Sequence, residues 1–246
     1  MSKLPDVLWL SVSPALRPFD RPLMQALSQT QTVGYWEYAQ TLDEPNSFDA
    51  ALVLLHDYLK HSDRPLHLIG HSTSGVLGLL YARQHPERVR SLTLLSVGVH
   101  PAIDWQAHYY AQAQLLRCSR SILLSQMVYN LFGRQPRATM SRWVTLLEED
   151  LLTSLSPHTL FKRVKVASGG VTVPLMVCGG GEDIIIDPPM LQGWQDWMRE
   201  GDRLWLCSEG GHFFHYHHPD LVDQAISEFW ALLHSRCSSQ MSLSPL

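Results

Sequence analysis

The stretch LHLIGHSTSG at residues 66–75 decides the fold. The apolar run at 66–69 predicts a buried strand, and the run at 74–84, rich in alanine, leucine and valine, predicts a helix directly after it. Gly70 and Gly75 border the tight turn between them, where a side chain would strike the neighbouring strand or helix. We expect this turn to lift Ser72 off the end of the sheet with its hydroxyl exposed.

The position of Ser72 predicts a nucleophile. The first backbone N–H groups and the positive dipole end of the following helix can stabilise a developing oxyanion. The pattern departs from G-x-S-x-G at Ser74, which stands where a second glycine is usual. Serine is small enough for a tight but workable turn. The alternative interpretation is an ordinary turn in which Ser72 caps the helix.

A nucleophilic serine needs a general base and a carboxylate that orients the base. Asp183 follows a predicted strand in GGGEDIIIDP (179–188), and His212 follows the next predicted strand in EGGHF (209–213). Carboxyl ends of parallel strands share one edge of a sheet, so both residues are expected on the same edge as Ser72. Asp183 is the expected orienting carboxylate. Two other acids that follow strands stay open as alternatives, Asp187 and Asp104.

Apolar runs alternate with amphipathic runs along most of the chain. The predicted strands are residues 7–12, 32–38, 66–69, 92–97, 173–178 and 203–207, and the predicted helices are residues 21–29, 48–59, 74–84, 190–199 and 219–233. Strands that alternate with helices predict an α/β fold with a mostly parallel central sheet and helices on both faces.

Residues 101–165 interrupt this alternation, because they contain apolar helical runs and no convincing strand. We expect them to form a helical cap on a core of residues 1–100 and 166–234, and we expect residues 235–246 to be a disordered tail. The cap carries a net charge of +4, which leaves −8 for the rest of the chain.

The aromatic residues and arginines of the cap predict a helical core with a basic solvated face. In a sharper hypothesis they roof an apolar pocket, and one or two arginines meet a substrate carboxylate. The aromatic residues are Trp105, Tyr109, Tyr110, Tyr129, Phe132 and Trp143, and the arginines are Arg117, Arg120, Arg134, Arg137 and Arg142.

These motifs together resemble the α/β-hydrolase superfamily. GHSTSG (70–75) is similar to its nucleophile elbow, GGGEDIIIDP (179–188) to its acid loop, and GGHFFHYHHPDLVDQAISEFW (210–230) to its histidine loop and last helix. ARQHPERVRSLTLLSVG (82–98) also resembles the stretch that follows the elbow. The resemblance covers nearly the whole chain and implies the α/β-hydrolase fold, with residues 101–165 in the place of the cap.

The resemblance also implies the roles of individual residues. Ser72 would be the nucleophile, His212 the base and Asp183 its orienter, and the Thr73 N–H would supply half of the oxyanion hole. A His-Gly loop usually supplies the other half, and this chain has Ser11 and Val12 there. The second donor is then the N–H of Val12 or Ser13, with Ser13 expected, since Pro14 has no N–H.

The composition excludes several classes of protein. The 19 basic and 23 acidic residues give a net charge of −4, which disfavours a nucleic-acid binder. No apolar run approaches the roughly 18 residues of a membrane span, and no signal peptide is visible. The 4 widely spaced cysteines are typical of a reducing compartment. We expect a cytoplasmic protein with a small-molecule substrate and no cofactor. The sequence does not indicate the oligomeric state.

A histidine-rich stretch raises the question of a metal site. It contains His212, His215, His217 and His218, but no cysteine or carboxylate cluster accompanies them at ligand spacing. We therefore predict no metal and a solvated loop beside His212. His71, which precedes Ser72, is expected to serve in packing.

The expected function is hydrolysis of an ester or thioester of a small to medium, largely apolar acyl compound. Two alternatives stay open. A C–C bond hydrolase or a proton-abstracting lyase would use the same three residues. A slow or non-catalytic ligand-binding protein would follow from the altered oxyanion loop, because one lost donor costs about 10²–10³ in rate.

Overall fold

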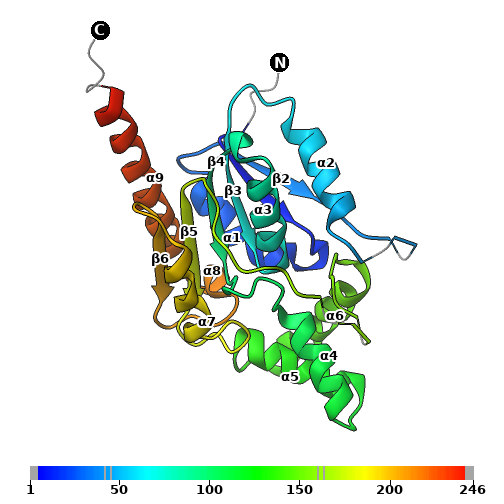
Figure 1. Cartoon of the computed structure of the whole chain (residues 1–246). Helices are drawn as coiled ribbons and strands as arrows, with labels where there is room; N and C mark the ends of the chain where they lie inside the picture. The colour runs from blue at the N-terminus through cyan, green and yellow to red at the C-terminus, as the bar shows by residue number, and fades with distance from the viewer. Residues whose placement is uncertain (1–4, 42, 45, 160, 163, 242–246) are drawn as a thin grey trace.

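A computed structural model describes residues 5–41, 43–44, 46–159, 161–162 and 164–241, with side chains described as far as residue 235. Six strands form one sheet in the order β2-β1-β3-β4-β5-β6, and all neighbouring strands are parallel (Figure 1). The strands are β1 (Val7–Ser11), β2 (Val33–Glu37), β3 (Leu66–His71), β4 (Val89–Leu95), β5 (Leu175–Gly180) and β6 (Arg203–Cys207). The predicted fold class is confirmed, with a sheet that is parallel in every described pair.

Helices follow the strands and cover both faces of the sheet (Figure 1). They are α1 (Arg17–Leu27), α2 (Asp49–Leu59), α3 (Thr73–Gln84), α4 (Trp105–Leu115), α5 (Arg120–Phe132), α6 (Arg137–Thr153), α7 (Pro188–Gln192), α8 (Phe214–His217) and α9 (Pro219–Met241). None of the helices in the described part of the chain is both long and apolar enough to cross a membrane.

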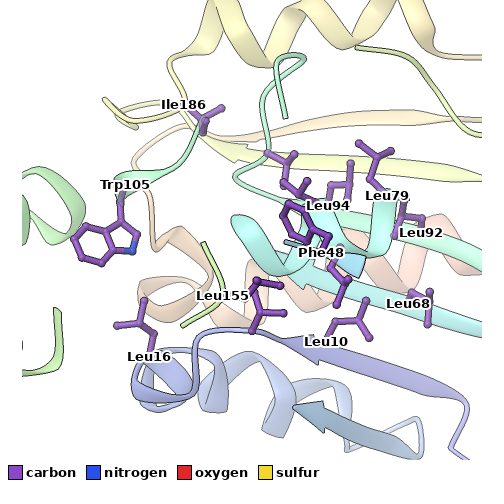
Figure 2. Close-up of a cluster of buried hydrophobic side chains, with 14 of the residues drawn as sticks. Leu10, Leu16, Phe48, Leu68, Leu79, Leu92, Leu94, Trp105, Leu155 and Ile186 are labelled. Carbon is purple, nitrogen blue, oxygen red and sulfur yellow. The ribbon is translucent and has the colours of Figure 1, made fainter. Parts of the chain in front are cut away.

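Strand β1 shows how the sheet divides the hydrophobic core. Leu8 and Leu10 pack in one cluster with α2 and α3, whereas Val7 and Trp9 pack in a second cluster with α1 and α9. This division arises because successive side chains of a strand point to opposite faces. Figure 2 shows part of the first cluster, to which Leu10 contributes from β1. Every residue of β1 is buried, as expected for a strand covered on both faces.

The helical insertion, defined as α4, α5 and α6, lies between β4 and β5 in the chain. Its three helices lie together at one end of the sheet (Figure 1). Buried side chains of the insertion, among them Trp105, Leu124 and Leu147, join the first core cluster. The insertion therefore packs on the core through apolar contacts.

Three expectations about the helices are corrected. Helix α1 starts at Arg17, ahead of the predicted start at residue 21. Pro18 fits in its first turn, because the N–H groups of the first turn have no acceptor within the helix and the missing N–H of proline is not needed there. The helix predicted at 190–199 is wrong. Helix α7 ends at Gln192 and a 3₁₀ turn (Gly193–Trp197) follows, where the buried Trp194 indole N–H donates to the Val97 carbonyl at 2.8 Å.

The third correction concerns the C-terminal segment. Helix α9 continues past residue 235 to Met241, so the prediction of a disordered tail is wrong for residues 235–241. Those residues contain neither glycine nor proline, so the backbone has no local reason to leave the helix. The rest of the predicted tail, residues 242–246, lies outside the described residues.

Candidate active site

Ser72 lies in the tight turn between β3 and α3. Its backbone has φ of 50° and ψ of −125°, a left-handed conformation that strains any residue except glycine. A Cβ atom on Gly70 would lie 2.6 Å from the Gly75 nitrogen, so the two glycines let β3 and α3 approach. The Ser72 hydroxyl accepts no hydrogen bond from α3. Ser72 is the N-cap residue of α3, but its side chain does not cap the helix, as the alternative interpretation required.

Asp183 and His212 form a fully buried pair at the same edge of the sheet. The His212 Nδ1–H donates to Asp183 Oδ2 at 2.9 Å. The other carboxylate oxygen, Oδ1, accepts from the N–H groups of Ile185 at 2.8 Å and Ile186 at 3.0 Å. Three donors thus fix the carboxylate, and the carboxylate fixes the tautomer of the histidine.

Two buried polar atoms of the site have no hydrogen-bond partner among the described residues, the Ser72 Oγ and the His212 Nε2. Ser72 is 9% exposed and His212 is 0% exposed. A buried polar atom without a hydrogen-bond partner is costly, so such atoms are few in a folded protein. These are the two atoms between which a serine nucleophile and its base exchange a proton.

The structure separates Asp183 from the two rival acids. Asp187 caps helix α7, where its carboxylate accepts from the Met190 N–H at 2.9 Å. Asp104 caps helix α4 and also accepts a hydrogen bond from the Thr73 hydroxyl at 2.7 Å. Neither carboxylate has a hydrogen bond to His212 in the described structure, so Asp183 is the acid that holds this histidine.

The backbone carbonyl of His212 is held from the side of β3 and β4. His71 donates through Nε2–H to this carbonyl at 3.0 Å, and the Ser96 hydroxyl donates to it at 2.8 Å. Burial, together with the neighbouring His215 and His212, lowers the pKa of His71 well below its usual range. A neutral His71 fits the expectation of a packing role, and it also positions the His212 backbone.

The expected oxyanion donors, Thr73 and Ser13, line one cavity of about 20 Å³ together with Ser72 and Trp105. A cavity of this size holds about one water molecule. The Val12 N–H is excluded as the second donor, because it donates to the Ser74 hydroxyl at 3.0 Å. Of the two candidates that the sequence left open, Ser13 is the one that remains available.

The histidine-rich stretch contains a buried hydrogen-bonded pair that the sequence did not predict. His215 is 0% exposed on helix α8, and its Nε2–H donates to Asp20 at 3.2 Å. The indole N–H of Trp9 donates to the same carboxylate at 3.1 Å. The prediction of a solvated loop is therefore wrong for His215, because the sequence spacing did not show that Asp20 of α1 lies against it.

Asp20, His71 and His215 are the group among the described residues that could hold a metal ion. One ligand atom of each lies within 4.8 Å of the others. The side chains of His215 and Asp20 are already hydrogen-bonded to each other, and the His71 Nε2 is bonded to a backbone carbonyl. The polar contacts of the group are thus those of a structural network.

Two residues of the helical insertion near the site carry no signal in the sequence. Asp150 of α6 is fully buried and accepts from the Trp105 indole at 3.1 Å and from Gln106 at 3.3 Å. Burial raises the pKa of Asp150 to about 7, although hydrogen bonds from Gln106, Trp105 and Ser13 lower it in part. Asp150 directly follows Glu148 and Glu149, which are exposed, and nothing in the sequence distinguishes the buried acid from its two neighbours.

The second missed residue is His108 of α4. Burial lowers its pKa, and so does the neighbouring His212. A hydrogen bond with the Ile185 backbone places His108 beside the loop that carries Asp183. A single histidine within a helix predicts no such neighbourhood.

The five arginines of the insertion (117, 120, 134, 137 and 142) are all exposed, and none lines the cavity at Ser72. Arg120 forms an ion pair with Glu148 at 3.2 Å on the surface. Most of the aromatic residues form part of a helical core, the first of the two interpretations. Four of them are buried in the core: Trp105, Tyr109, Phe132 and Trp143.

A model of the alpha/beta hydrolase family matches residues 16–225. The chain belongs to the alpha/beta hydrolase family. An uncharacterized protein of Synechocystis sp. is 50% identical over 96% of this chain and 95% of its own length.

Solved structures of the family resemble this chain over almost its whole length. A meta-cleavage product hydrolase from Pseudomonas fluorescens is 15% identical over 92% of this chain and 89% of its own, with a TM-score of 0.68. An esterase from Exiguobacterium antarcticum is 16% identical over 91% and 90% of the two chains, with a TM-score of 0.65. At these identities the likeness shows the alpha/beta hydrolase fold, which hosts more than one reaction.

Proposed function

We propose that this alpha/beta hydrolase is a serine esterase or thioesterase for small to medium, largely apolar acyl compounds. The observation that carries the proposal is the buried hydrogen bond of 2.9 Å between Asp183 and His212, on the sheet edge that also carries the strained turn of Ser72. The histidine atom that faces away from Asp183, Nε2, has no hydrogen-bond partner among the described residues, so no other group competes with Ser72 for it.

The reaction follows from these atoms. The Ser72 Oγ attacks the acyl carbonyl while its proton passes to His212 Nε2, and the carbonyl electrons move onto the oxygen. The N–H groups of Thr73 and Ser13 stabilise that oxyanion. The C–O or C–S bond then breaks, and His212 returns the proton to the leaving group. Water, deprotonated by His212, releases the acid from Ser72.

The cavity and its surroundings support an uncharged, short acyl group. The cavity at Ser72 has a volume of about 20 Å³, and Leu16, Trp105 and Phe213 contribute apolar walls. No lysine or arginine of the described chain lines it. The helical segment 101–165 acts as the cap in this proposal, because Trp105 and Gln106 of α4 close the cavity.

The narrow cavity also favours a second candidate, a slow or non-catalytic ligand-binding member of the fold. Labelling with a fluorophosphonate probe separates the two candidates, with the Ser72→Ala variant as the control. We expect labelling of the wild-type chain, loss of labelling in the variant, and turnover of p-nitrophenyl esters that declines from acetate to octanoate. A folded wild-type chain that the probe does not label, beside a labelled control hydrolase, would refute the esterase.

A further inference from the structure

The loop after β1 departs from the family pattern, and its backbone groups are almost all occupied. The Val12 N–H donates to the Ser74 hydroxyl at 3.0 Å, and the Val12 carbonyl accepts from the Leu155 N–H at 3.0 Å. The Ser13 carbonyl accepts from the Leu16 N–H at 3.0 Å. The Ser13 N–H is the group of this loop that has no partner among the described residues, since Pro14 has no N–H.

Ser74 is the second departure from the family pattern, and the structure joins it to the first. The side chain of Ser74 comes from the first turn of α3, two residues after Ser72, and it is 6% exposed. Glycine at this position would have no hydroxyl, and the Val12 N–H would then be buried without an acceptor. A backbone N–H in that state costs free energy and turns toward any acceptor within reach.

Resting on the function proposed above, we propose that Ser74 is a positioning residue for the oxyanion hole. Its hydroxyl holds the Val12 N–H, and the following Ser13 N–H is thereby directed to the cavity at Ser72. The Leu155 N–H, just after α6, donates to the Val12 carbonyl and so holds the next peptide group, the one that contains the Ser13 N–H. Figure 2 shows Leu155 in the cluster that contains Leu10 of β1 and Leu16. Ser74 thus takes over the loop-orienting role for which the chain lacks the usual His-Gly.

A positioning role predicts a loss that is confined to the tetrahedral state. In that state the Ser72 Oγ is bonded to the former carbonyl carbon, and the negative charge on oxygen is bound by Thr73 and Ser13. A planar substrate carries a neutral carbonyl oxygen and no such oxyanion. Removal of the Ser74 hydroxyl should therefore lower kcat and leave KM almost unchanged.

The experiment compares the wild type with Ser74→Ala and Ser74→Gly, the second of which restores the residue usual in the family. The control is Ser91→Ala, which removes a buried hydroxyl bonded to His67 Nδ1 at 2.6 Å on the same sheet. Each protein is assayed for ester hydrolysis and for inhibition by an aryl trifluoromethyl ketone, which forms a tetrahedral adduct with serine.

We expect both Ser74 variants to lose about 10–100-fold in kcat and the same factor in affinity for the ketone. Their KM should stay within about twofold of wild type, and Ser91→Ala should change none of these quantities. Full kcat in a folded Ser74 variant, or an equal loss of kcat in Ser91→Ala, would overturn the proposed role of Ser74 but not the proposed esterase function. A wild type that neither turns over esters nor binds the ketone would overturn the proposed esterase, and the role of Ser74 with it.

Discussion

Replacing Asp183 by asparagine perturbs the proposed triad at one atom. The asparagine oxygen can keep the hydrogen bonds from Ile185 and Ile186 at 2.8 and 3.0 Å. The amide nitrogen then faces His212 Nδ1, where the carboxylate oxygen now accepts at 2.9 Å. Two donors cannot share this contact, so the imidazole moves its proton to Nε2. In that tautomer His212 has no lone pair for the Ser72 proton.

The magnitude follows from the loss of the general base. A wrong histidine tautomer in a serine triad costs about 10⁴-fold in kcat, or about 5 kcal/mol of transition-state stabilisation. The shape of the buried pair is almost unchanged, so KM and the folded structure should be retained. Ester hydrolysis and the rate of fluorophosphonate labelling measure the loss, and thermal unfolding checks the fold.

Asp187→Asn is the matched control for this variant. Asp187 follows the same strand but only caps α7, so its replacement should lower stability by about 1 kcal/mol or less and leave kcat near that of wild type. An Asp183→Asn variant that is folded and keeps more than about a tenth of the activity would refute the role of Asp183. A large loss in Asp187→Asn with little loss in Asp183→Asn would move the role to the rival acid.

Three further predictions concern residues around the site. Burial raises the pKa of Asp150 from 3.8 to about 7. Because the folded protein holds this proton more tightly than the unfolded chain, the free energy of unfolding should fall by on the order of 4 kcal/mol as pH rises from 4 to 7, and this contribution should not change further above pH 7. Asp150→Asn should lack that decline when the free energy of unfolding in urea is compared at pH 4.5 and pH 8. An equal decline in the wild type and in the variant would contradict the role of Asp150. Trp105→Ala should enlarge the cavity and raise kcat/KM for an octanoate ester relative to acetate by about tenfold. An unchanged ratio in the folded variant would show that Trp105 does not limit acyl length. Gly70→Ala should destabilise the fold by roughly 3 kcal/mol and abolish labelling of Ser72, because the new Cβ meets the backbone of Gly75. Gly133→Ala, whose Cβ meets nothing within 4 Å, should cost only about 1 kcal/mol at its positive φ and keep full labelling.

The parts of the fold that the sequence predicts well are those with strong local signals. Strand β6 (Arg203–Cys207) matches its predicted bounds. Ser72 lies in the predicted turn, because the glycines on either side of the turn have no Cβ that would keep β3 and α3 apart. The edge of the sheet that holds Asp183 and His212 follows from parallel topology alone. The prediction of a helix at 190–199 is wrong, because Trp194 packs against the loop that follows β4 and donates to the Val97 carbonyl there. No local sequence pattern encodes this contact, which accompanies a 3₁₀ turn in place of the helix.

Local sequence determined the alternation of strands and helices, the turn at Ser72 and the order of the three candidate residues, since these depend on hydrophobic period and on glycine. Tertiary structure alone decided which acid meets His212, which backbone N–H of the loop stays available, and where His215 and Asp150 lie. Each of those outcomes joins residues far apart in the chain, such as Val12 with Ser74 and Asp20 with His215. Hydrogen bonds over such separations form only when packing brings the elements together, and for that reason the sequence left them open.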